Sequence, residues 1–138
     1  MTKLSNFQNI GQMADRVPGA ARQVLVVEDD EATRSFIAET LVGMGYRVME
    51  SPDGAHALAR LDVDPPDIVL LDLHRVFDGW AFLAALQRQP ARPRVVIMSG
   101  EDAERAATAL GVEGHLEKPF SASSLVALVD RCVYDIAS

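Results

Sequence analysis

The chain has little that could cross-link it or hold it in a membrane. Its 138 residues include one cysteine, Cys132, so no disulfide can form within the chain. No apolar stretch approaches the roughly 20 residues of a membrane-spanning helix. The opening sequence MTKLSNFQNI also lacks the long apolar segment of a secretory signal peptide. We therefore expect a cytoplasmic protein with no membrane partner, in which Cys132 is a buried thiol of an apolar helix face.

Positive charge is also scarce. Thirteen Lys and Arg oppose twenty Asp and Glu, which gives a formal net charge of −7. Nucleic-acid binding requires a basic surface, so we expect no nucleic-acid partner. The hydrophobic content of 49% is enough for one domain of this length with its own core.

Short apolar runs alternate with longer amphipathic segments. We expect strands at residues 24–27, 46–50, 67–72, 94–98 and 113–117, and helices near 32–45, 54–61, 80–87, 102–110 and from 121 onward. The runs VLVV, IVLL and VVIM are unbroken, which is typical of parallel strands covered on both faces. The pattern predicts an α/β fold, a doubly wound five-stranded parallel sheet with helices on both faces.

Each predicted helix has one apolar face with a period near 3.6 residues. In the first helix the residues expected to face the sheet are Phe36, Ile37, Thr40, Leu41 and Met44. In the third helix they are Trp80, Leu83, Ala84 and Gln87, and in the last helix Leu125, Leu128, Val129 and Cys132.

Polar residues stand where the predicted strands end. Glu28 and Asp29 follow the first strand, Asp72 ends the third, Ser99 follows the fourth, and Lys118 follows the fifth. The carboxyl ends of parallel strands share one edge, where ligands bind in open α/β sheets. Carboxylates held close together repel one another, so one takes a proton or a cation lies among them. Oxygen donors without His or Cys favour Mg²⁺, and we expect this ion and Lys118 to keep Asp72 ionised.

Four motifs occur at these strand ends in the order VLVVEDD, DIVLLDL, VVIMSG and HLEKPF. In this order they resemble the receiver domain of bacterial two-component response regulators, and the resemblance covers about residues 22–134. It implies the flavodoxin-like strand order 2-1-3-4-5. We expect an N-terminal extension at 1–22, a receiver domain at 23–134 and a short tail at 135–138.

The resemblance also implies roles for individual residues. Asp72 would accept the phosphoryl group and, with Asp29, bind Mg²⁺ directly. Glu28 would act on the metal through a water molecule, and the backbone carbonyl of His74 would be a further ligand. These implied roles are chemically consistent, because a carboxylate attacks phosphorus only when the charge on both partners is neutralised.

A second set of implied roles concerns the switch that follows phosphorylation. Ser99 would hydrogen-bond the attached phosphoryl group, Lys118 would pair with it, and Pro119 would follow a cis peptide bond. His115 stands where the family usually has a switch aromatic. An imidazole can make the same inward movement with less apolar area and a pH-sensitive charge.

The sequence departs from the family pattern after the acceptor. Val76 stands where a Pro is usual, and Asp78–Gly79 comes one residue early, so the loop that would supply the His74 carbonyl is shortened. The segment between Ser99 and Lys118 is about three residues shorter than usual in the family.

Other interpretations of single residues stay open. Asp29 and Asp30 could cap the following helix, with capping favoured for Asp30. His115 could be an exposed edge-strand residue without a switch role. His74 and Glu101 could tune the lifetime of the acyl phosphate or simply lie on the surface. The extension could be a flexible tail or an amphipathic helix.

The function expected first is a stand-alone receiver. It would take a phosphoryl group from a histidine kinase or a histidine phosphotransfer protein and signal to a downstream protein, without being a multiple-turnover enzyme. The alternatives are a receiver-like binding module with impaired phosphorylation, and a small hydrolase that uses Asp72 as a transient nucleophile. A nucleotide-binding fold is disfavoured because no Gly-rich loop follows the first strand. The sequence does not indicate an oligomeric state.

Overall fold

A five-stranded parallel sheet with the order β2-β1-β3-β4-β5 forms the centre of the protein. The computed structural model describes residues 22–73, 76–90 and 92–134, with the side chains of 76–80 outside that description. The predicted doubly wound fold and its strand order are confirmed. The expected extension, apart from Arg22, and the expected tail lie outside the described residues.

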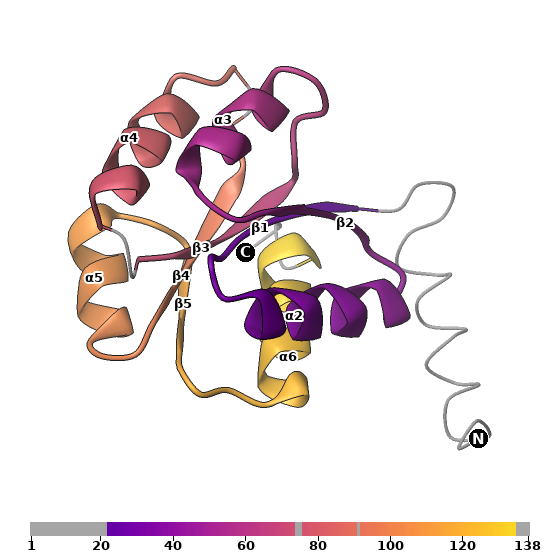
Figure 1. The fold of residues 1–138 in the computed structure, drawn as a ribbon. Coiled ribbons are helices and arrows are strands. Elements are labelled where there is room, and N and C mark those ends of the chain that lie inside the picture. The colour runs from indigo at the N-terminus through magenta and orange to yellow at the C-terminus, as the bar shows by residue number, and fades with distance from the viewer. Residues whose placement is uncertain (1–21, 74–75, 91, 135–138) are drawn as a thin grey trace.

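Strands and helices alternate strictly along the chain (Figure 1). The strands are β1 (Gln23–Val27), β2 (Arg47–Ser51), β3 (Ile68–Asp72), β4 (Arg94–Ser99) and β5 (Gly114–Glu117). The helices are α2 (Glu31–Gly43), α3 (Gly54–Leu61), α4 (Val76–Gln87), α5 (Ala103–Leu110) and α6 (Ala122–Tyr134). Within the part of the chain that the structure describes, no helix is long and apolar enough to cross a bilayer.

Helices cover the sheet on both faces, with α2 and α6 on one side and α3, α4 and α5 on the other (Figure 1). Alternate residues of β1 serve the two layers. Val24 and Val26 pack toward α2 and α6, whereas Leu25 and Val27 pack toward α3 and α4. All four are buried, because a central parallel strand has no solvent face. The two apolar layers therefore hold the carboxyl ends of β1, β3 and β4 at fixed positions along one edge.

Local capping explains where α2 begins and ends. The side chain of Asp30 accepts a hydrogen bond from the backbone amide of Thr33, as an N-cap residue does. The predicted capping role of Asp30 is confirmed. At the other end Gly45 has a φ of 97°, a value that favours glycine and turns the chain into β2.

Two predicted helix faces are partly wrong. Phe36 is 40% exposed, because the inward face of α2 is centred on Ile37, Ala38 and Leu41. In α4, Ala84 and Gln87 are exposed, whereas the inward side chains are Phe82, Leu83 and Leu86. In α4 the larger apolar side chains bury more area, so they decide which face of that helix packs against the sheet. The side chain of Trp80 lies outside the described residues.

The apolar face predicted for the last helix is correct. The buried side chains of α6 include Leu125, Leu128, Val129 and Cys132. Cys132 is the buried free thiol that the sequence predicts.

Candidate functional site

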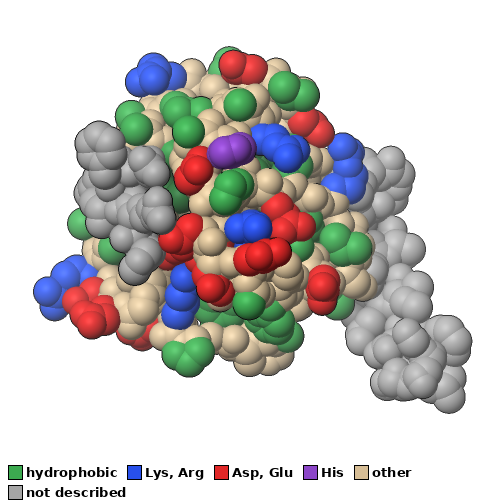
Figure 2. All heavy atoms as spheres, viewed as in Figure 1, with side chains coloured by type: hydrophobic (Ala, Val, Ile, Leu, Met, Phe, Trp, Pro, Cys, Tyr) green, Lys and Arg blue, Asp and Glu red, His purple; other side chains and the backbone are tan. Residues whose placement is uncertain are grey.

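An acidic cluster lies at the carboxyl edge of the sheet. One carboxylate oxygen from each of Glu28, Asp29 and Asp72 lies within 4.8 Å of the others. Glu28 and Asp29 come directly after β1, and Asp72 is the last residue of the neighbouring strand β3. On the face seen in Figure 2, Asp and Glu side chains gather around a Lys or Arg side chain near the middle. The strand ends thus bring together the three acids that the sequence singles out.

The three acids differ in burial. Glu28 is 1% exposed and Asp72 is 9% exposed, whereas Asp29 is half-buried. Burial raises the pKa of Glu28, and the negative charge of Asp72 adds to that effect, although the hydrogen bonds from Lys118 and from the amide of Asp30 oppose it. Such a group favours a nearby positive charge more strongly than an exposed carboxylate would.

Lys118 supplies that charge from the end of β5. Its Nζ lies 2.7 Å from Oε1 of Glu28 and 3.3 Å from Oδ1 of Asp72. Burial alone would lower the pKa of Lys118, but the hydrogen bond to Glu28 and the charge of Asp72 outweigh burial and raise it. Lys118 is therefore a fixed cation between two buried carboxylates. The Lys118–Pro119 peptide bond is cis, as expected.

The loop between β1 and α2 is held by contacts that the sequence analysis did not identify. Arg34 donates a hydrogen bond from Nη1 to the backbone oxygen of Glu28 at 2.9 Å and forms an ion pair with Glu50 at 3.4 Å. The amide of Asp30 donates to Oε2 of Glu28 at 3.1 Å. Arg34 thereby positions the acids, and its place one turn after the capping Asp30 is the signal that could have identified it.

Ser99 is the last residue of β4, but its hydroxyl is engaged locally. Oγ donates to the backbone oxygen of Glu101 at 2.7 Å and accepts from the amide of the same residue at 3.2 Å. Asp102, which follows, has a φ of 51°, a left-handed conformation that costs free energy in residues other than glycine. The structure therefore places Ser99 beside the acidic edge with its hydroxyl turned to its own loop.

Of the two candidate histidines, His115 lies in a described strand and His74 does not. His115 is exposed on the edge strand β5, opposite Ile97 of β4 in the strand register. His74 lies outside the described residues. β3 ends at Asp72 and α4 begins at Val76, so residues 73–75 connect the two elements. The shortening of this loop relative to the family pattern stays a prediction.

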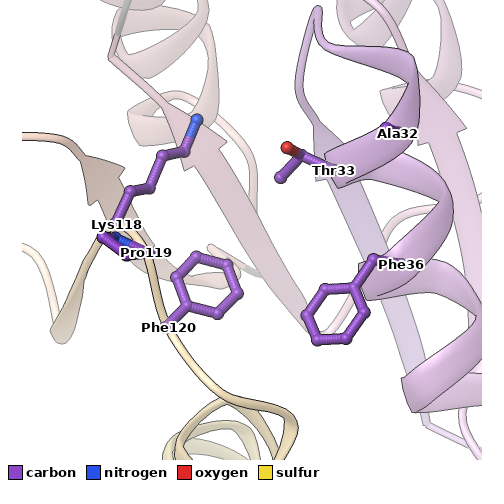
Figure 3. A pocket seen from close by; sticks show the side chains of 6 residues that line it. All are labelled: Ala32, Thr33, Phe36, Lys118, Pro119 and Phe120. Atoms are coloured by element: carbon purple, nitrogen blue, oxygen red, sulfur yellow. The ribbon is translucent and has the colours of Figure 1, made fainter.

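An apolar groove adjoins Lys118 (Figure 3). Its volume is about 470 Å³, and its lining residues are Ala32, Thr33, Phe36, Lys118, Pro119 and Phe120. The rings of Phe36 and Phe120 lie 6.4 Å apart, one from α2 and the other from the segment after β5. The exposure of Phe36, which the helix pattern did not predict, therefore places an aromatic side chain in the same groove as Lys118.

Residues 24–130 match the response regulator receiver domain family. The chain is a member of that family. This match confirms the resemblance inferred from the four motifs. Receiver domains belong to two-component response regulators and are signalling phosphoacceptors.

Curated relatives agree with this assignment. This receiver domain is 33% identical over 114 residues to the DNA-binding transcriptional regulator NtrC of Escherichia coli K12, covering 80% of this chain and 24% of that protein. It is 36% identical over 107 residues to the KDP operon transcriptional regulatory protein KdpE of Escherichia coli K12, covering 75% of this chain and 48% of that protein. The chain thus spans less than half of the length of either relative.

Solved structures show the same fold over their full length. The chemotaxis protein CheY4 of Vibrio cholerae is 27% identical, with a TM-score of 0.74, covering 82% of this chain and 99% of that chain. A signal receiver domain from Bermanella marisrubri is 28% identical, also with a TM-score of 0.74, covering 83% of this chain and 99% of that chain.

The acidic cluster fits a hard divalent cation. Among the residues that the structure describes, all of its side-chain donors are carboxylate oxygens, and no sulfur or ring nitrogen belongs to it. Three carboxylates so close together carry more negative charge than Lys118 alone can balance. Asp29 and Asp72 would hold a magnesium ion, with Glu28 available to orient one of its water ligands. The backbone carbonyl predicted at His74 lies outside the described residues.

Proposed function

We propose that Asp72 accepts a phosphoryl group from a phosphohistidine donor and that the resulting charge switches a protein-binding surface. The observation that supports this is the buried Asp72 carboxylate, which has Lys118 at 3.3 Å and two further acids beside it at the same edge. We take the domain to be residues 23–134 and expect it to act in the cytoplasm as a phosphoacceptor rather than as an enzyme with multiple turnovers.

In the transfer step, Oδ of Asp72 bonds to phosphorus while the bond between phosphorus and the donor imidazole nitrogen breaks. The imidazole leaves with the electron pair and takes a proton from solvent. Magnesium, when bound, supplies positive charge that reduces repulsion between the carboxylates and the incoming phosphoryl oxygens. Lys118 adds a fixed positive charge next to Asp72, and Arg34 keeps the loop of Glu28 and Asp29 in place.

Ser99 is the residue that we expect to respond after transfer. Its hydroxyl would break its hydrogen bond to the Glu101 backbone oxygen and donate to a phosphoryl oxygen instead. The loop before α5 would move with it. His115 on β5 would then move toward the space that Ser99 and its loop leave. The readout would be a change in the surface around β5, recognised by a downstream protein. The net charge of −7 argues against nucleic acid as the direct partner of this domain.

The apolar groove beside Lys118 supports a protein donor. A phosphohistidine presented by another protein must approach the acidic edge along some neighbouring surface, and the groove with Phe36 and Phe120 adjoins that edge. Exposed aromatic side chains of this kind bury large apolar areas at interfaces. We expect the Phe36→Ala variant to slow transfer from a phosphorylated histidine phosphotransfer protein while leaving labelling by the small donor phosphoramidate unchanged.

Labelling by phosphoramidate tests the proposed phosphorylation. The full chain is incubated with phosphoramidate, with and without Mg²⁺, and the phosphorylated fraction is measured by mass spectrometry. We expect labelling that requires Mg²⁺ and is lost in Asp72→Asn, whereas Asp62→Asn, at an exposed acid after α3, labels like the parent. Labelling that persists in Asp72→Asn would exclude Asp72 as the acceptor.

A second candidate is a receiver-like binding module that does not take a phosphoryl group. The short connection between Asp72 and α4 favours it, because that connection would supply the His74 carbonyl. A folded parent protein that phosphoramidate and a phosphohistidine protein both fail to label would favour this candidate. Repeated release of phosphate from an external phosphate ester would instead indicate the hydrolase.

A further inference from the structure

A cavity lined by arginines lies at the edge of the sheet opposite the acidic cluster. Its volume is about 310 Å³, and its lining residues are Arg22, Asp67, Arg92, Arg94, Glu113, Cys132 and Val133. Arg22 precedes β1, Asp67 precedes β3, Arg94 begins β4 and Glu113 precedes β5. The starts of four parallel strands thus form its walls, and the end of α6 closes it with Cys132.

The two carboxylates of the cavity are already engaged by strand backbones. Oδ2 of Asp67 accepts a hydrogen bond from the amide of Gln23 at 2.8 Å. Oε1 of Glu113 accepts from the amide of Val95 at 2.7 Å, and its Oε2 lies 3.7 Å from Arg92. These acids satisfy backbone amides near the starts of β1 and β4.

Two of the arginines keep their donors available. Within the described ranges 22–73, 76–90 and 92–134, the guanidinium groups of Arg22 and Arg94 form no ion pair or hydrogen bond. Arg22 lies over the ring of Tyr134 at 5.8 Å, a contact that leaves its N–H edge available. Both residues are half-buried, so their side chains are held at the cavity rather than extended into solvent.

The charge of Arg94 also reaches Cys132. Burial raises the pKa of this thiol, and the positive charges of Arg131 and Arg94 oppose the rise. The negative charge of Glu113 acts in the opposite direction to that of Arg94, so both charges of the cavity wall reach its interior. A half-buried pair of arginines without carboxylate partners, around a cavity of this size, is suited to a ligand that brings its own negative charge.

We propose that this cavity binds a small anion with two or more oxyanion groups, held by Arg22 and Arg94. The guanidinium fork matches phosphate and carboxylate oxygens equally well, so the shared feature of the ligand is its closely spaced oxyanions. The cavity lies at the small end of the range for small-molecule sites, which suits a compact ligand. The proposal is independent of phosphorylation, because Asp72 lies at the opposite edge.

Titrations of the full chain with inorganic pyrophosphate and with citrate, in separate arms, test the site. Divalent cations are removed from the protein and the buffers on a chelating resin, so that no cation draws an anion to the acidic cluster and no soluble chelator competes for the cavity. Ionic strength is held constant. Assigned amide resonances report the location of binding. We expect a saturable shift at Arg22, Arg94, Cys132 and Val133 with at least one of the two anions. Binding of pyrophosphate alone identifies a phosphate ligand, and binding of citrate alone a carboxylate ligand.

Charge-matched variants test whether Arg22 and Arg94 are responsible for binding of the anion. Arg94→Gln and Arg22→Gln should each weaken binding by about tenfold, the loss expected when one charge-assisted contact is removed. Arg60→Gln, at an exposed arginine of α3, removes the same charge and should bind within twofold of the parent. Arg94→Lys keeps the charge without the fork, so it should fold like the parent and bind with intermediate affinity.

Two results would overturn the proposal. One is the absence of any saturable shift at the cavity with either anion. The other is a loss of affinity in Arg60→Gln as large as that in Arg94→Gln, which would mean that the anion responds to overall charge. The Asp72→Asn variant should bind the anion like the parent, so a failure of the phosphorylation assay would not affect this result.

Discussion

Lys118 and Glu28, which are 90 residues apart in the chain, form an ion pair in which Nζ donates to Oε1 across 2.7 Å. Glu28 is 1% exposed, so this pair places a positive charge against a buried carboxyl group beside Asp72, the proposed acceptor. The same ammonium lies 3.3 Å from Asp72. One cation therefore connects the end of β5 with the ends of β1 and β3.

Replacing Lys118 by Met should destabilise the protein. We expect the free energy of unfolding in EDTA to fall by about 1–3 kcal/mol, since two carboxylates lose a partner. The loss should be smaller than for a fully buried pair, because the Lys118 side chain is 25% exposed. Urea denaturation measures it, with Arg60→Met as the control. Adding Glu28→Gln to Lys118→Met should recover part of the loss, and strictly additive effects would contradict a direct pairing.

The Asp29→Asn variant should have opposite effects with and without magnesium. In EDTA it removes one of three mutually repelling charges and should stabilise the protein by up to about 1 kcal/mol. With saturating Mg²⁺, the parent should be stabilised by ligand binding, and a tenfold weaker site would cost the variant about 1.4 kcal/mol of that gain. Thermal unfolding at several Mg²⁺ concentrations distinguishes the two regimes. An unchanged response to Mg²⁺ would exclude Asp29 as a ligand.

The Ser99→Ala variant tests the hydroxyl that now contacts Glu101. Before phosphorylation the loss should be small, about 0.5 kcal/mol, because Ser99 is only half-buried and water can replace its hydrogen bonds. Labelling of Asp72 by phosphoramidate should be slower, since no hydroxyl would be available for the phosphoryl group. The Ser99→Thr variant keeps the hydroxyl and should label at the parent rate. Equal labelling rates in the Ala and Thr variants would show that the Ser99 hydroxyl takes no part in the reaction.

Stability should depend on pH through Asp30. Hydrogen bonds from the Thr33 hydroxyl and the Thr33 amide hold the pKa of Asp30 below its ordinary value of 3.8. A lowered pKa means that the folded state favours the carboxylate, so the stabilisation is present above the unfolded-state pKa and is lost as the pH falls through the folded-state pKa. The parent should therefore be more stable than Asp30→Asn at neutral pH, and this difference in stability should shrink as the pH falls below about 4. Urea midpoints at pH 6 and pH 3 measure this, and a constant difference would contradict it.

The His115→Tyr variant tests the switch position on β5. Phosphoramidate labelling should be unchanged, because His115 is exposed and no contact of it with Asp72 or Lys118 is found among the described residues. Beryllofluoride with Mg²⁺, which mimics the phosphoryl group, should shift the ring resonances of the side chain at this position in both the parent and the variant. Ring resonances that stay in place in both proteins would indicate an exposed edge residue with no part in switching.

The fold followed from local features of the chain. Unbroken runs such as VLVV and IVLL, separated by helix-length segments, predict a parallel sheet covered on both faces, because only such strands lack a solvent side. The position of Asp72 directly after IVLL predicts its place at the carboxyl edge, and the Lys-Pro dipeptide predicts Lys118 at the same edge. The capping role of Asp30 could also be predicted, since an N-cap bond joins residues three apart.

Contacts between distant segments could be decided only by the tertiary structure. The exposure of Phe36, the Arg34 contact with the Glu28 backbone and the engagement of Ser99 by Glu101 depend on side-chain directions that periodicity does not specify. The arginine cavity is the clearest example, because it gathers the starts of four strands and the end of α6. By itself, the sequence determined which residues lie at the carboxyl edge of the sheet. Which charges find partners there depended on packing in three dimensions, because each ion pair requires two side chains to meet across the fold.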